Sequence, residues 1–83
     1  MNAQLKEALG TATDKAFEEY KRLHPALADF LETCEEDIFP ELVESIEYDP
    51  ESLKALEVAH AENRVKDVVE LVMQYLPGII GRM

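Results

Sequence analysis

The residues with the clearest chemical character are carboxylates that crowd the middle of the chain. The segment from Leu23 to Leu53 holds ten acids and neither lysine nor arginine, whereas the rest of the chain holds eight acids and eight bases. This segment therefore carries the whole net charge of −10. Such a surface attracts basic partners and steers their approach. Helical spacing predicts one outward docking face made of Asp29, Glu32, Glu36, Glu41, Glu44 and Glu47.

A plainer interpretation of the same carboxylates is a solvated helix face that only keeps the protein in solution. Like charges three or four residues apart destabilise a helix by roughly 0.2–0.5 kcal/mol each. Interspersed lysines would remove that penalty, and the segment has none. Both interpretations remain open, and we take docking on a basic protein surface as the leading one.

A second arrangement with possible chemistry is Glu57-x-x-His60, the spacing at which di-iron carboxylate bundles hold metal. A ferritin-like dimer would present two such pairs. Two features count against this alternative: no carboxylate lies at the centre of the preceding apolar stripe, and Arg64 would place a positive charge beside the cation. The sequence therefore predicts no cofactor and no metal, with Glu57 and His60 as the alternative ligands.

Catalytic and phosphate-binding patterns are missing from the sequence. Its three glycines match no phosphate-binding spacing. Cys34 lies in an apolar stripe beside Glu35 and Glu36, which disfavour a thiolate, so we expect a structural cysteine. His24 precedes Pro25, where a histidine satisfied by backbone is expected. The sequence predicts that the protein is not an enzyme.

Length and composition indicate one helical domain over residues 1–83, near the size at which a single core is barely sufficient. A lone cysteine forms no internal disulfide, and no apolar run approaches the roughly 18 residues of a membrane span. The opening MNAQLKEALG lacks the apolar region of a signal peptide, so we expect a cytoplasmic protein without membrane contact. Its acidity argues against direct nucleic-acid binding, which needs lysine and arginine.

All strong patterns are helical, and capping residues predict where helices begin. Asn2 caps a short helix over Ala3 to Leu9 that stops at Gly10, and a second helix begins near Asp14. Pro25 interrupts that helix without shifting its phase, which predicts a kink or a new helix in line. The apolar stripe of this region comprises Phe17, Tyr20, Leu23, Leu27, Phe30, Leu31, Cys34 and Ile38.

Two further helices follow from the proline positions. IFPELVESIEY predicts a short third helix with Pro40 in its first turn. Asp49 then caps a long last helix that starts at Pro50 and runs to about Tyr75, ending at LPG, and the tail GIIGRM packs against the rest.

We therefore expect an all-α bundle built on an αα-hairpin of two long helices, with a short connecting helix and a short N-terminal helix. One hairpin leaves much of each stripe in water. This favours a two-fold homodimer buried through Leu27, Leu31, Leu71 and Tyr75.

Three functional classes are compatible with these patterns. The leading one is a non-enzymatic acidic adaptor or inhibitor that docks on a basic, nucleic-acid-binding surface of a larger protein, in the manner of phage-type inhibitors and DNA mimics. The alternatives are a purely structural homodimer, whose acidity only gives solubility, and the di-iron-type metal protein.

Overall fold

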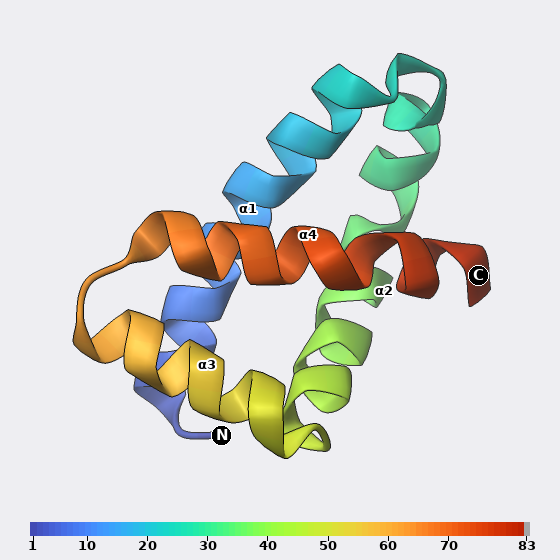
Figure 1. The fold of residues 1–83 in the computed structure, drawn as a ribbon. Coiled ribbons are helices and arrows are strands. Elements are labelled where there is room, and N and C mark those ends of the chain that lie inside the picture. The colour runs from blue at the N-terminus through green and yellow to red at the C-terminus, as the bar shows by residue number, and fades with distance from the viewer. Residues whose placement is uncertain (83) are drawn as a thin grey trace.

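The computed structural model describes residues 1–82 and is an all-α bundle of four helices, as expected (Figure 1). The first helix, α1, spans Ala3–Leu23. Its predicted cap is confirmed, because the Asn2 side chain accepts a hydrogen bond from the Leu5 amide at 2.8 Å.

The predicted stop at Gly10 and restart near Asp14 are wrong, since α1 continues through both. A glycine ends a helix by adopting a left-handed backbone, and no described glycine has positive φ. Buried Leu9 and Ala12 flank Gly10 on one stripe, and their burial favours a continuous helix.

At Pro25 the chain reverses direction, so the prediction of a kink or a helix in line is wrong (Figure 1). His24 leaves the helical region at φ −131° and ψ 69°, as the residue before a proline tends to do. A single 3₁₀ turn over Pro25–Leu27 follows, and α2 then spans Ala28–Glu47 alongside α1. The predicted apolar stripe is therefore only partly buried. Phe17, Tyr20, Leu31 and Ile38 belong to the core, Leu27 and Cys34 are half-buried, and Leu23 and Phe30 are exposed.

The predicted short third helix is the second half of α2, because Pro40 lies inside the helix. A proline there removes one backbone hydrogen bond, the one that the Glu36 carbonyl would accept. Ile38 and Leu42 on either side are fully buried, and this packing favours continuation.

The start of α3, which spans Pro50–Ala61, is as predicted, with Asp49 as the cap. The single long helix to Tyr75 is wrong, because the chain turns at residues 62–64 before α4 begins at Val65. Asn63 adopts φ 56° in this turn. Asparagine tolerates this left-handed conformation better than most residues.

The hydrogen bonds around Asn63 form a Schellman motif, the usual ending of a helix with a left-handed residue. The Asn63 amide donates to the His60 carbonyl at 3.2 Å, and the Arg64 amide donates to the Ala59 carbonyl at 2.8 Å. These two bonds satisfy the Ala59 and His60 carbonyls near the end of α3.

The last helix, α4, spans Val65–Arg82 and continues past Pro77. The predicted packing of the tail is confirmed for its described part, since Ile79 is buried, whereas Met83 lies outside the described residues. Figure 1 shows α4 crossing the α1–α2 hairpin, and its buried side chains meet those of the other three helices. The core comprises Leu5, Leu9, Ala12, Ala16, Phe17, Tyr20, Leu31, Ile38, Leu42, Ile46, Leu56, Ala59, Val68, Val72, Leu76 and Ile79.

This arrangement covers much of the stripe that motivated a dimer. Leu31 is fully buried within the chain and cannot join an interface, while Leu27, Leu71 and Tyr75 are half-buried. The sequence paired the second helix with the last across a short helix, whereas the observed hairpin of two long helices pairs α1 with α2 through the 3₁₀ turn, and α4 occupies its open side. A homodimer stays a prediction that no contact here tests.

Candidate functional site

The six acids predicted to form a docking face all lie on α2 with exposed side chains. The buried residues of α2 recur every four or seven positions and so form one stripe along the helix. The six acids fall between these positions and therefore lie on the rest of the helix surface, away from the stripe. We call this set, Asp29, Glu32, Glu36, Glu41, Glu44 and Glu47, the acidic face.

Three members of the acidic face have cationic neighbours from other parts of the chain. Lys21 of α1 lies 3.7 Å from Glu32, and Arg82 of α4 lies 3.6 Å from Glu41. The amino group of Met1 lies 3.2 Å from Glu47. All three carboxylates are solvent-exposed, and ion pairs of this kind contribute little to stability.

The other three members, Asp29, Glu36 and Glu44, have no ion-pair partner within residues 1–82. Their side chains are exposed, so solvent ions can approach their charges. A basic partner can therefore replace those ions without first breaking a contact of this protein.

Sequence reasoning missed a hollow at the C-terminal end of the acidic face. It has a volume of about 360 Å³ and is lined by Glu41, Glu44, Ser45, Tyr48 and Arg82. Tyr48 is 80% exposed, more than any other large hydrophobic side chain described. The sequence held one signal for this hollow: the aromatic residue Tyr48 lies outside the apolar stripe of α2 and between two acids, Glu47 and Asp49.

A second polar cluster joins α3 to α4. The Tyr75 hydroxyl lies 2.9 Å from Asp49 Oδ2 and 2.6 Å from Ser52 Oγ, and Ser52 Oγ donates to Asp49 Oδ2 at 3.1 Å. The hydrogen bond from Tyr75 is the largest of several that hold the pKa of Asp49 below its usual value. Burial, more than any other influence, raises the pKa of Tyr75. Each member is accounted for by helix capping and packing, so we assign the cluster a structural role.

The alternative metal ligands are not brought into a metal-binding arrangement. Glu57 and His60 are exposed on α3, and the described residues contain no group of three or more histidine, cysteine, aspartate and glutamate side chains suited to hold an ion. Arg64 pairs with Glu62 and Asp67.

Cys34 and His24, the two residues considered for nucleophilic or acid–base chemistry, belong to no such cluster of histidine, cysteine and acidic side chains among the described residues. Cys34 is half-buried and packs against the core. His24 is exposed, and its ring lies 4.5 Å from that of Tyr20.

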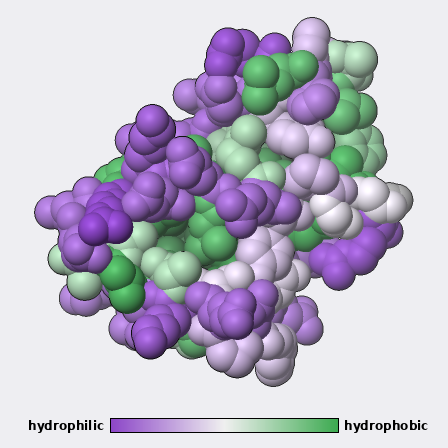
Figure 2. All heavy atoms as spheres, in the orientation of Figure 1, coloured by the Kyte–Doolittle hydropathy of each residue, from purple (hydrophilic) through white to green (hydrophobic). Residues whose placement is uncertain are grey.

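A groove of different character runs between α3 and α4. Figure 2 shows hydrophobic surface gathered between these helices with hydrophilic surface around it. The groove measures about 620 Å³, and Ala55, Val58 and Leu71 supply apolar lining. Its rim mixes both signs of charge, for example Lys54 with Glu70, so it lacks the single sign of the acidic face.

No protein-family model matches the chain, and neither a curated protein nor a solved structure was found to match it. Within residues 1–82, every helix falls short of the combination of length and apolarity that crossing a membrane requires.

Proposed function

We propose that this protein is a non-enzymatic interaction protein whose acidic face docks on a basic surface of a larger protein. One observation carries the proposal: all six carboxylates are exposed on a single helix, α2, which contains neither lysine nor arginine. A helix that needed only solubility would gain from interspersed lysines, which relieve repulsion between neighbouring carboxylates.

The density of charge along α2 suits a partner that binds nucleic acid. Asp29 and Glu47 are separated by about 27 Å along the axis, at 1.5 Å per residue. Eight carboxylates of α2 lie in that span. This is about one charge per 3–4 Å, close to the roughly 3.4 Å per charge along one strand of B-DNA. A protein surface that neutralises phosphates with lysine and arginine would meet a similar row of charges here, so we propose inhibition by DNA mimicry.

The experiment starts with capture of partners from the native host at low and at high salt. Screening acts over about 8 Å at physiological ionic strength, so a surface charge interaction weakens as salt rises. A basic partner, once identified, is then titrated with the purified protein. We expect salt-sensitive binding that displaces nucleic acid from the partner, and retention of the nucleic acid would contradict the mimicry.

The decisive variant reverses Glu36, Glu41 and Glu44 to lysine. These side chains are exposed, so circular dichroism should show an intact fold while partner binding is lost. The matched control reverses Glu57, Glu62 and Glu70, which changes net charge equally on α3, α4 and their connection. Equal loss in both variants would show that only net charge matters. Full binding by the first variant would show that the acidic face is only a solvated surface.

Two further predictions accompany the proposal. A cytoplasmic location remains an expectation from the sequence. The homodimer is tested by sedimentation equilibrium at micromolar concentration, where a monomer throughout would contradict it.

A further inference from the structure

The hollow at the end of α2 combines groups that suit one kind of side chain. Glu41 and Glu44 supply two carboxylates from successive turns, and Tyr48 supplies an aromatic ring one turn further on. A planar cation can pair with a carboxylate and stack on a ring at the same time.

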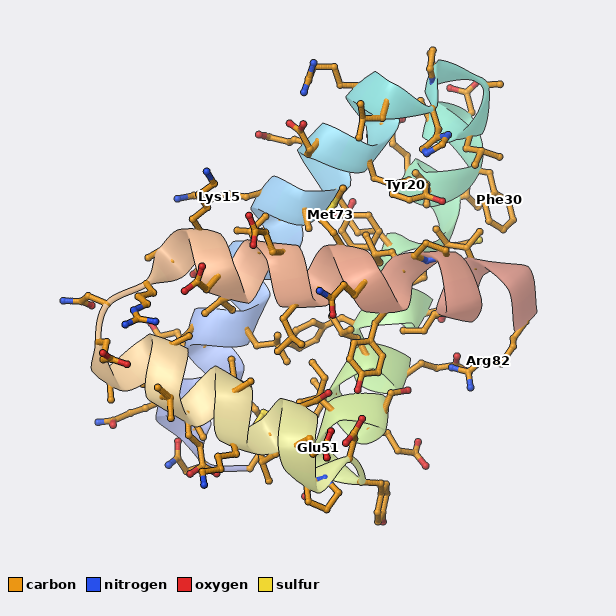
Figure 3. The ribbon with its side chains drawn as sticks, in the orientation of Figure 1. Lys15, Tyr20, Phe30, Glu51, Met73 and Arg82 are labelled. Carbon is orange, nitrogen blue, oxygen red and sulfur yellow. The ribbon has the colours of Figure 1, made fainter. Side chains whose placement is uncertain are left out.

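A guanidinium of the chain itself lines this hollow, that of Arg82. In Figure 3 the Arg82 side chain extends from the C-terminal end of α4 toward α2. Its Nη2 lies 3.6 Å from Oε2 of Glu41, longer than the roughly 2.7–2.9 Å of a strong charge-assisted hydrogen bond. Both side chains are about half exposed, so the pair is loosely held and open to competition.

We propose that this hollow is the anchor point of the acidic face, that it accepts an arginine side chain of the partner, and that Arg82, which lines the hollow and pairs with Glu41, competes for that carboxylate until the partner displaces it. The inference rests on the proposed function and adds which basic residue is recognised and where. Arginine is preferred to lysine because the guanidinium stacks on Tyr48 while its N–H groups reach Glu41 and Glu44, whereas an ammonium is a strongly hydrated point charge. Tyrosine and arginine are also among the residues that most often dominate interfaces.

The probes are two capped peptides of equal charge, hexa-arginine and hexa-lysine, titrated into the full chain by calorimetry at physiological salt. The stacking of an exposed cation on an aromatic ring predicts a preference for hexa-arginine of about two- to fivefold. Tyr48→Ala should abolish this preference, and Tyr48→Phe should retain it. Arg82→Gln should tighten binding of hexa-arginine, because the internal competitor is gone.

The matched control is Phe30→Ala, which removes an exposed aromatic side chain at the opposite end of α2 and should leave the preference unchanged (Figure 3). Equal affinity for the two peptides would overturn the anchor, as would a preference that survives Tyr48→Ala. Either result would leave the acidic face intact as a docking surface. If neither peptide binds even at low salt, the proposed function itself fails.

Discussion

The hydroxyl of Tyr75 lies 2.9 Å from Oδ2 of Asp49, and this contact ties the middle of α4 to the first turn of α3. The same carboxylate caps α3, because Oδ1 accepts hydrogen bonds from the amides of Glu51 and Ser52. Both ends of α3 are thus tied to α4, by the turn at Asn63 and by this cluster. One aspartate therefore serves both the start of a helix and the angle between two helices.

Tyr75→Phe should lower the free energy of unfolding by about 1 kcal/mol, because it removes a hydroxyl hydrogen bond while keeping the ring in place. Urea denaturation followed by circular dichroism measures the change. Tyr48→Phe is the control, since Tyr48 is 80% exposed and its hydroxyl meets water. Equal stability of the Tyr75 variant and wild type would show that the cluster does not hold α3 against α4.

The lowered pKa of Asp49 predicts a contribution to acid sensitivity. A folded-state pKa below the ordinary value of 3.8 means that the folded protein binds fewer protons than the unfolded chain. The carboxylate therefore stabilises the fold above about pH 4, and this contribution is lost as pH falls through the folded-state pKa.

Asp49→Asn isolates that contribution, because asparagine is an equally good helix cap and has no titrating group. We expect the stability difference between wild type and variant to shrink as the pH falls from 6 toward about 2. Unfolding curves in urea across this range give the difference directly. Parallel pH profiles for the two proteins would contradict the assigned shift.

Gly10→Ala should raise the free energy of unfolding by roughly 0.5–1 kcal/mol, the usual gain of alanine over glycine inside a helix. The added methyl group would lie 3.8 Å from Cζ of Phe39, an ordinary contact. Gly78→Ala is the companion variant, because nothing lies within 4 Å of the site and the gain there comes from the backbone alone. A loss of stability in Gly10→Ala would mean that the helix ends at this glycine after all.

The turn between α3 and α4 allows a paired test at Asn63. Asn63→Gly should be neutral or slightly stabilising, because glycine adopts φ 56° without strain. Asn63→Ala should lower the free energy of unfolding by about 1 kcal/mol, since Cβ disfavours the left-handed backbone. Thermal unfolding of the two variants side by side gives the comparison. Identical melting curves would argue against a left-handed residue at this position.

Helix starts were predictable because a cap depends on residues within one turn. Asn2 bonds to the amide three residues on, and Asp49 bonds to those of Glu51 and Ser52. The continuation of a helix through Gly10 and Pro40 was not predictable from local sequence. It depends on buried residues on either side of each position, which hold the backbone in the helix. The turn at Asn63 was missed because asparagine is a weaker stop signal than glycine.

The candidate site was likewise predictable only in part. Exposure of the acidic face follows from periodicity along one helix, which the sequence displays directly. The hollow beside Tyr48 depends on Arg82, which reaches it from another helix. Only the crossing of α4 over the α1–α2 hairpin brings Arg82 near Glu41, and no local pattern contains that crossing.

The packing of α4 against α1 also bears on how the chain matures during synthesis. The ribosome makes α1 first and α4 last, yet their buried residues belong to one core. Until α4 emerges, the core that Phe17 and Leu9 share with it is incomplete, so the nascent chain holds an unfinished hydrophobic surface. The strongly charged α2 is made in that interval, and its repulsion between chains opposes aggregation of neighbouring nascent copies before the core closes.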